Sequence, residues 1–352
     1  MAPLPPPSFV SKPVDFLFAG GLSIVQLLLF SLTDIDSDVT SWALAAGWLT
    51  WVVNYPHFSA TSHRLYQSRT NIMQFPVTAL AVPVIVLLMT AASLAQPTTV
   101  APWFLKLYLF WSAWHFSAQS LGVALLYAHR SGFVVDAQTR RCLSAFIYAS
   151  FICPAIYVQT KIAPVIHYGV PVPSFMLPAW IGSWVIWLTL LPGTALVLSL
   201  YLSAQRQKRR VPFLMMTVLL AQTSWFLLGR SNMAYQAFVP GWHSLQYLFI
   251  AWAVQLHTRI DRDGKRPSLF FASVETLRWF LLNCFGGFVL FALFPYIAWR
   301  NTDLPFYVVF GIVIAGVQIH HFFVDGVIWK LRTSAIRQPL MTNWAHLTGR
   351  SA

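Results

Sequence analysis

Histidines recur in four largely apolar stretches of the sequence, and each stretch also carries an amide or a carboxylate. The stretches are 54-NYPHFSATSH-63, 114-WHFSAQ-119, 242-WHSLQ-246 and 320-HHFFVD-325. Residues three or four positions apart lie on the same face of a helix. The pairs with this spacing are Asn54 with His57, His115 with Gln119, His243 with Gln246, and His321 with Asp325. A metal-binding histidine commonly donates its second ring N–H to such a neighbour, so the pattern predicts a shared metal site.

The polar residues of these stretches have distinct expected roles. The expected metal ligands are His57, His63, His115, His243, His320 and His321. Asp325 and Gln119 are the candidate catalytic side chains, and the Asp325 carboxylate would also balance the charge of a cation in a low dielectric. Asn54 and Gln246 are expected to orient imidazole rings without binding the metal.

Two of these histidines have an alternative interpretation. His243 lies outside the cluster if its helix begins near Pro240, and His63, beside Arg64, is either a ligand at the cytoplasmic mouth of the site or a solvated side chain. A single histidine inside a membrane more often makes a hydrogen bond between helices. The recurrence on four helices is what favours a common site. The remaining histidines, His129, His167, His257 and His346, are interpreted as interfacial or solvated residues.

The mixture of many imidazoles with one carboxylate limits the choice of metal. It suits iron, copper or zinc and excludes calcium and magnesium, which require a cage of oxygen ligands. A redox-active non-haem metal, iron first, facing an apolar pocket fits best. Aromatic residues near the histidines are candidate walls for a lipid or isoprenoid substrate: Phe58, Trp114, Phe116, Trp242, Phe322 and Phe323.

The composition indicates a polytopic, all-α membrane protein. Of the 352 residues, 57% are hydrophobic and only 9% are charged, and the mean hydropathy is +0.61. This is too little polar surface for a soluble globule. Apolar stretches of roughly the length that a bilayer requires predict about ten spans. Their expected ranges are 16–33, 40–60, 75–95, 103–128, 142–160, 177–202, 212–229, 238–258, 277–298 and 305–329.

The net charge of +13 is explained by membrane topology. On the ten-span interpretation, the 23 Lys and Arg residues fall almost entirely on the amino-terminal side, and the exceptions are Lys106, Lys161, Arg230 and Arg300. The positive-inside rule then predicts that both termini are cytoplasmic, as in a protein of the bacterial inner membrane. The basic loops would contact anionic membrane lipids, and no nucleic-acid partner is expected.

The chain is expected to form one domain. Residues 1–15 are proline-rich and predict a disordered lead, residues 16–330 predict the transmembrane domain, and residues 331–352 predict a cytoplasmic tail. The segment 161–176, with three prolines and a glycine, is expected to form an external loop. The three cysteines have no CxxC spacing and are interpreted as packing residues.

The motifs NYPHF, WHFSAQSLG, WHSLQYL and HHFFVDGVIWK resemble those of uncharacterised bacterial polytopic membrane proteins. They also resemble, more loosely, the multi-histidine integral-membrane non-haem iron oxygenases, among them the Brp/Blh-type carotene dioxygenases. The HxxHH boxes of fatty-acid desaturases and alkane hydroxylases are absent. The resemblance implies an iron that is held by histidines of several helices and activates dioxygen, and it implies no particular substrate. The hydrophobic small-molecule substrate is expected from the aromatic walls instead, and the sequence identifies neither an electron donor nor a partner subunit.

Three other classes of function remain open at this point. Haem or chlorophyll-type pigments also use histidines on facing helices, although they need small flanking residues that admit a macrocycle. A transporter or proton relay would use the same intramembrane polar residues, with helix breaks in matching halves of the chain. A non-catalytic assembly subunit of a membrane complex is the third. We expect an oxygen-dependent enzyme that oxidises or cleaves a lipid or isoprenoid.

Overall fold

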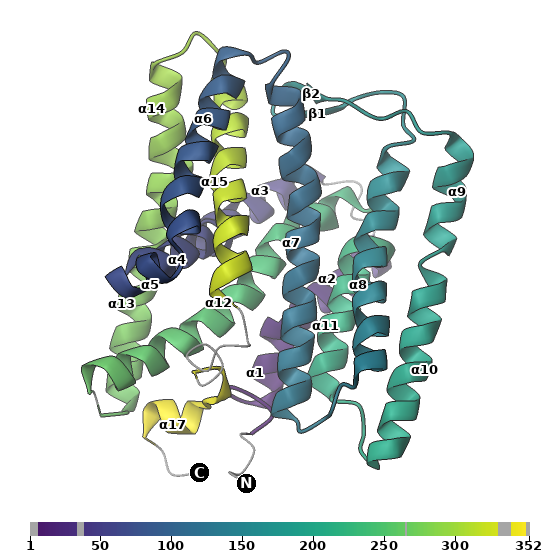
Figure 1. The fold of residues 1–352 in the computed structure, drawn as a ribbon, viewed down its shortest axis with the longest axis vertical. Helices are drawn as coiled ribbons and strands as arrows, with labels where there is room; N and C mark the ends of the chain where they lie inside the picture. Colours follow the sequence, from purple (N-terminus) through teal and green to yellow (C-terminus); the bar gives the residue numbers. More distant parts are fainter. Residues whose placement is uncertain (1–5, 34–38, 265, 330–338, 350–352) are drawn as a thin grey trace.

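The computed structural model describes residues 6–33, 39–264, 266–329 and 339–349. Over these ranges the fold is almost entirely helical, with a single two-stranded antiparallel sheet (Figure 1). The helices and π-helical turns (η), with one 3₁₀ turn (η7), are α1 (Lys12–Phe16), η1 (Leu17–Gly21), α2 (Leu22–Leu32), α3 (Val39–Leu49), η3 (Thr50–Asn54), α4 (Tyr55–Tyr66), α5 (Arg69–Gln74), η4 (Val77–Ala81), α6 (Val82–Ala95), α7 (Ala101–Arg130), α8 (Ala137–Val158), α9 (Ala179–Trp187), α10 (Leu190–Gln207), α11 (Phe213–Thr223), η5 (Ser224–Leu228), α12 (Met233–Asp263), α13 (Leu269–Phe288), η6 (Val289–Leu293), α14 (Phe294–Arg300), α15 (Phe306–Ile328), η7 (Pro339–Met341) and α17 (Trp344–Thr348).

Each of the ten expected spans overlaps helical structure, and the all-α prediction is confirmed. By length and composition, six helical segments of the described chain could cross a membrane: Lys12–Leu32, Val77–Ala95, Ala137–Val158, Ala179–Gln207, Leu269–Arg300 and Phe306–Ile328. Among the helices outside this group are α4, α7 and α12, which carry most of the polar residues singled out in the sequence.

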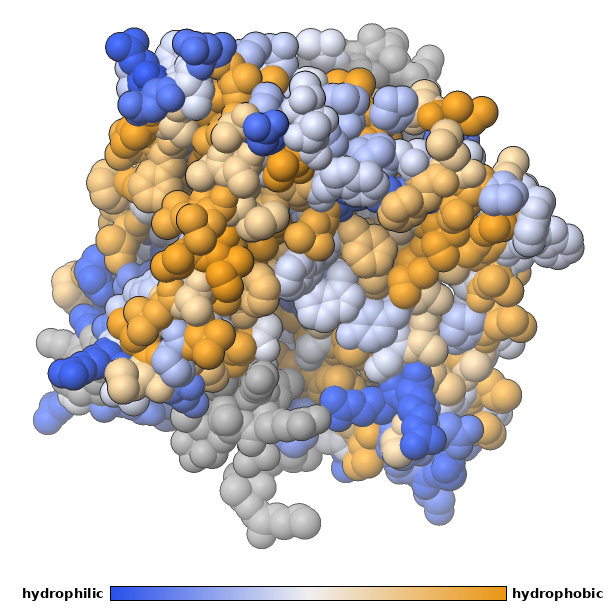
Figure 2. Space-filling model, turned by 45° about the horizontal axis from the view of Figure 1, so that its top comes forward, coloured by the Kyte–Doolittle hydropathy of each residue, from blue (hydrophilic) through white to orange (hydrophobic). Residues whose placement is uncertain are grey.

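The surface agrees with a membrane location. Figure 2 shows that hydrophobic side chains dominate the middle of the visible face, whereas hydrophilic side chains gather toward its top and bottom. Many large apolar side chains are exposed on the segments that could span a bilayer, among them Leu87 (69% exposed), Leu191 (69%) and Phe285 (66%). Such a surface is stable against lipid and would aggregate in water.

Several π-helical turns occur just before a proline. The turns η3, η4 and η6 end two residues before Pro56, Pro83 and Pro295, each of which lies in the first turn of the following α-helix. A proline inside a helix lacks an N–H and its ring clashes with the carbonyl four residues earlier. A wider turn moves that carbonyl away and keeps the helix continuous. At η3 this adjustment sets the position of His57, the residue after Pro56.

Helix α7 is the centre of the packing. The two largest apolar clusters of the described residues include its opposite ends: residues 123–128 pack with α8, α11 and α12, and residues 101–108 pack with α6 and α15. In Figure 1, α7 and α15 stand nearly upright, and α12 runs obliquely across the bundle. Helix α4 packs against α12, α13 and α15. The four helices that carry the histidine stretches therefore meet inside one bundle.

The expected external loop forms a short β-hairpin, β1 (Val165–His167) with β2 (Val170–Val172). The turn between the strands requires positive φ angles, which Tyr168 and Gly169 adopt. The hairpin lies at the end of the bundle opposite α1 and α17 (Figure 1).

The expectation of a disordered lead over residues 1–15 is wrong for residues 6–15. Phe9 is 2% exposed, and the backbone N–H groups of Phe9 and Val10 donate to the carboxylate of Asp15 at 2.7 and 3.0 Å. Residues 1–5 lie outside the described part of the chain, as do residues 331–338 of the expected tail. The tail residues that are described, 339–349, pack against the bundle through Leu340 and Leu347.

Arg130, at the end of α7, joins both terminal segments. It is 1% exposed, and its guanidinium donates to the carbonyl oxygens of Pro6, Ser8 and Leu340 at 3.0, 2.8 and 2.6 Å. The guanidinium also lies 4.0 Å from the ring centre of Phe9. A buried cation requires this many partners because its desolvation is costly.

Replacing Arg130 by Gln should therefore destabilise the protein by about 3–5 kcal/mol, the range observed when one partner of a buried charged network is removed. The exposed Arg140 offers a matched control, and R140Q should leave stability nearly unchanged. Thermal unfolding of the detergent-solubilised protein measures both effects. Equal unfolding temperatures for R130Q and R140Q would contradict this role of Arg130.

Candidate metal centre

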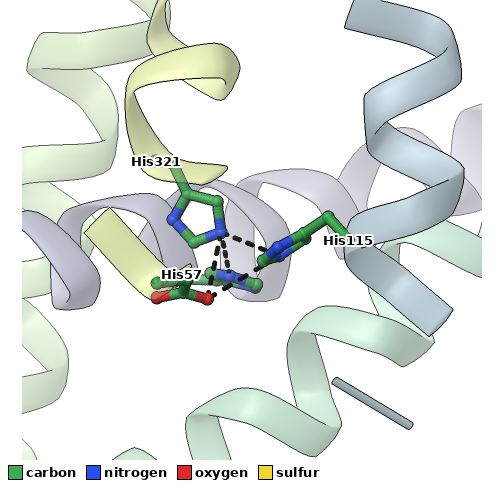
Figure 3. Close-up of side chains that lie close together, drawn as sticks. His57, His115 and His321 are labelled. Atoms are coloured by element: carbon green, nitrogen blue, oxygen red, sulfur yellow. Dashed lines mark hydrogen bonds and ion pairs between the residues drawn. The ribbon is translucent and has the colours of Figure 1, made fainter. Parts of the chain in front are cut away.

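Three helices bring histidine side chains to one point in the bundle. His57 comes from the first turn of α4, His115 from the middle of α7, and His321 from the last third of α15. Figure 3 shows the three imidazole rings turned toward one another. All three side chains are buried, with exposures of 0%, 5% and 1%. Asp325, one turn after His321 on α15, completes the group.

The donor atoms of this group are close enough to share one ion. The Nε2 atom of His321 lies 2.8 Å from Nε2 of His57 and 3.1 Å from Nε2 of His115. Oδ2 of Asp325 lies 3.5 Å from Nε2 of His321 and 3.7 Å from Nε2 of His115. One ligand atom from each of the four residues lies within 4.8 Å of all the others. This buried cluster could hold a metal ion.

Protons satisfy this arrangement only in part. In a neutral imidazole each ring nitrogen either donates one hydrogen or accepts one, so a hydrogen on Nε2 of His321 must be shared between its two contacts with the other imidazoles. Without that hydrogen, lone pairs face each other in a dry interior. A cation at the centre removes the conflict, because all three nitrogens and the carboxylate can then act as donors of electron pairs.

A chain of hydrogen bonds fixes which nitrogen of His57 faces the centre. The hydroxyl of Ser244 donates to Oδ1 of Asn54 at 2.7 Å, so its oxygen is left to accept from Nδ1 of His57 at 2.9 Å. With its hydrogen on Nδ1, the His57 ring presents an unprotonated Nε2 to the other ligands. Asn54 thus orients the imidazole as expected, but through Ser244.

Asp325 is also held in place from outside the cluster. The hydroxyl of Thr61 donates to Oδ1 of Asp325 at 3.1 Å, and the Thr61 oxygen lies 2.6 Å from the hydroxyl of Tyr247. This leaves Oδ2 directed at the imidazoles. Thr61 is one turn after His57 on α4, so one helix supplies both a candidate ligand and the support for another.

His243 lies beside the cluster without a partner of its own. It is 1% exposed, and neither ring nitrogen has a hydrogen-bond partner. Its ring centre lies 5.2 Å from that of His57 and 5.0 Å from that of His115, and it stacks on Phe116 at 4.0 Å. A buried imidazole with two unsatisfied nitrogens is costly, which points to a ligand in the adjacent space.

The other predicted residues lie around the centre or away from it. His320 is on the other face of α15, where Nε2 contacts the hydroxyl of Tyr66 at 3.2 Å, because consecutive helical residues differ by about 100°. His63, further along α4, is likewise outside the group of converging ligand atoms in the described chain. The structure therefore does not bring His320 and His63 together with the other predicted ligands.

The two predicted glutamines bind backbone groups and each other. Nε2 of Gln119 donates to Oε1 of Gln246 at 2.9 Å and to the carbonyl oxygen of His243 at 3.0 Å. Gln246 in turn donates to the carbonyl of Ala19, beside the kink at Gly20. They fasten α12 to α7 and to the first span, and in this arrangement their amide nitrogens do not contact an imidazole ring.

A cavity of about 230 Å³ adjoins the candidate centre. His115 and Asp325 form part of its wall, and the rest comes mainly from apolar residues of α7, α12 and α15. The centre is thus buried from water yet reachable from inside the bundle.

Three residues that hold the candidate ligands by hydrogen bonds were not predicted from the sequence: Ser244, Thr61 and Tyr247. Ser244 directly follows His243, and Thr61 is four residues after His57, so both were within the selected stretches or next to their histidines. Their partners are on other helices, however, and only the fold reveals them. The chain matched no protein-family model, no characterised protein sequence and no solved structure.

Removal of one converging imidazole should abolish metal retention. For H321A we expect the affinity for the bound metal to fall by more than about 100-fold, because loss of a ligand exceeds the 10–100-fold effect of losing an outer hydrogen bond. The matched control is H320A, which removes the neighbouring imidazole outside the cluster and should leave metal content unchanged. Elemental analysis of the purified variants distinguishes them, and equal losses in both would refute the assignment of ligands.

The hydrogen bond from Nδ1 of His57 to Ser244 should increase the affinity for the metal, although Ser244 is not a ligand. S244A leaves the His57 tautomer unfixed, and the affinity for the metal should fall by about 10–100-fold. Ser120 provides a control, since it is also 0% exposed but its hydroxyl has no hydrogen-bond partner. Competition with a chromophoric chelator measures the affinity. If S244A and S120A bind metal equally well, the proposed chain from Asn54 to His57 has no role in binding.

Proposed function

We propose that this protein is an integral-membrane metalloenzyme that uses a non-haem metal, with iron favoured over copper and zinc, to oxidise or cleave a hydrophobic substrate with dioxygen. The observation that carries the proposal is the convergence of His57, His115, His321 and Asp325 in the bundle interior. These four buried residues each direct an electron-pair donor at the same point. Without a cation their lone pairs repel one another, which is difficult to explain in a purely structural network.

The donor set supports a transition metal. Nε2 of His321 lies 2.8 Å and 3.1 Å from the other two imidazoles, and Oδ2 of Asp325 lies 3.5 Å and 3.7 Å from Nε2 of His321 and His115. Two ligands of one ion with bonds of about 2.1 Å are about 3.0 to 3.4 Å apart, so this spacing is close to that of a shared ion. A mixed imidazole and carboxylate set with positions left open is typical of non-haem iron oxygenases.

His243 extends the proposed site. Its ring is beside those of His57 and His115, and a metal-bound small molecule would supply the partner that its nitrogens lack. We propose that His243 is either a further ligand or the group that exchanges a proton with the bound molecule. Gln119 lines the adjoining cavity and would contact the substrate there.

The metal would supply the ability to bind and activate dioxygen, and the chain would supply the dry, oriented surroundings. A reaction that places both oxygen atoms in the substrate needs no external electrons. A reaction that places only one needs two electrons and two protons from a donor, which a partner subunit would provide.

We propose that the chain crosses the membrane ten times and that both termini lie in the cytoplasm, as in a bacterial inner-membrane protein. Arg130 contacts Pro6 and Leu340, so the first and last described segments lie at the same end of the bundle, as an even number of crossings requires. The resemblance to multi-histidine membrane iron oxygenases agrees with this arrangement. A haem is disfavoured, because its two axial nitrogens would be about 4 Å apart across the macrocycle. The Nε2 atoms of this cluster are closer, at 2.8 and 3.1 Å.

The purified protein should contain about one iron per chain and show no Soret band in its absorption spectrum. After reduction, nitric oxide should bind at a free coordination position and give the high-spin electron paramagnetic resonance signal of an iron–nitrosyl centre. H321A should give no signal, and H320A should match the original protein. A Soret band, stoichiometric zinc without a nitrosyl signal, or the absence of any metal would each overturn the proposal.

A further inference from the structure

The cavity beside the candidate metal centre lies between matching faces of two helices. Its wall on α7 runs from His115 through Gly122 to Leu126, residues that recur at helical spacing on one face. This face extends about 16 Å along the helix axis. The wall on α15 includes Phe322, Asp325 and Gly326, and the ring of Phe322 stacks on that of His115 at 4.8 Å, so α15 faces the part of the α7 wall that holds His115. The cavity is therefore elongated, and one end of it is at the metal ligands.

Two glycines keep this cavity open. A Cβ atom at Gly122 or at Gly326 would meet no atom within 4 Å, so neither glycine is needed for close packing of helices. Most glycines inside the other helices differ, because a Cβ there would collide with a neighbouring element, as at Gly286 with Ser59. Glycine costs about 1 kcal/mol relative to alanine inside a helix. Both glycines line one cavity, and the space left by their missing side chains explains why glycine occurs at these positions.

The polar groups of the cavity are concentrated at the metal end. His115, Gln119, Tyr247 and Asp325 are the polar side chains of the wall near the centre, and the remainder of the wall is apolar or tryptophan. Trp114 on α7 is 37% exposed and Gly326 on α15 is exposed, and both line the cavity, so we place its entrance between these two helices. Lipid is the medium on this side of a membrane protein, so a molecule dissolved in the bilayer can reach the cavity without crossing water.

We propose that this cavity binds the substrate, and that the substrate is a slender hydrocarbon chain with a polar end placed at the metal. A volume of about 230 Å³ spread along the α7 wall is narrow, and it suits a single chain better than a fused ring system. This inference rests on the proposed function, because the metal is what holds the polar end. It adds the shape of the substrate, the side from which it enters, and the residues that select it.

Alkyl hydroxamates test the inference, because a hydroxamate chelates a metal while its tail occupies the adjoining space. Binding of acetohydroxamate and of octanohydroxamate is measured by calorimetry on the metal-loaded, full-length protein. Each buried methylene contributes about fourfold to affinity. Because detergent also takes up the longer tail, we expect a net gain of at least about tenfold for octanohydroxamate.

The variants G122F and G326F place a bulky side chain in the cavity at positions where a Cβ atom meets no atom within 4 Å, and G47F is the matched control. A Cβ atom at Gly47 would also meet no atom within 4 Å, and this glycine is exposed on α3, away from the cavity. Acetohydroxamate should bind all four proteins equally. The gain from the longer chain should be lost in G122F and G326F and kept in G47F.

The outcomes separate the two proposals. If the longer chain gives no gain in the original protein, or the same gain in all variants, the cavity is not the substrate site although the metal centre stands. If neither hydroxamate binds and no metal is present, the metal centre fails and the inference fails with it. Loss of acetohydroxamate binding in G122F alone would show that the substitution disturbs the ligands, and G326F then decides the question.

Discussion

The fold depends on placing three imidazole nitrogens and one carboxylate around a single point inside an apolar bundle. Without a cation the nitrogens of His57, His115 and His321 compete for too few hydrogens, and the carboxylate of Asp325 is left with a weak counter-charge. Three helices must hold their positions against this conflict. The hydrogen bonds of Ser244, Thr61 and Gln119, all between different helices, are the means by which they do so.

The helices that carry the candidate ligands differ from the surrounding helices in hydropathy. Helix α15 is apolar enough to cross a membrane although it carries His321 and Asp325, because the rest of it is almost entirely aliphatic or aromatic. Helix α4 has many polar residues, and α7 and α12 each carry several. Surrounding helices such as α6, α8, α10 and α13 face outward with large apolar side chains. The candidate ligands and most of the lipid-facing apolar side chains therefore lie on different helices.

Much of the fold and part of the candidate site could be predicted from the sequence. Apolar stretches near 20 residues located the helical segments, and the spacing of His321 and Asp325 placed them on one face of α15. Periodicity describes a single helix, however, and says nothing of what faces it. His320 and His321 were equally plausible by type, and only the rotation of α15 against α4 decides that His321 points inward. Ser244 and Asn54 are 190 residues apart, and no local pattern relates them.

The buried contacts of Arg130 have a consequence for how the chain reaches its final state during synthesis. The guanidinium of Arg130, at the end of α7, has its full set of hydrogen-bond acceptors only after Leu340 has been synthesised, 210 residues later in the chain. Until Leu340 has been synthesised, the N-terminal segment that holds Phe9 lacks this fastening, and Nη1 of Arg130 lacks the acceptor that it has in the folded protein. Leu340 follows α15 in the chain, so this end of α7 is completed only after all of the helices from α1 to α15 have been made.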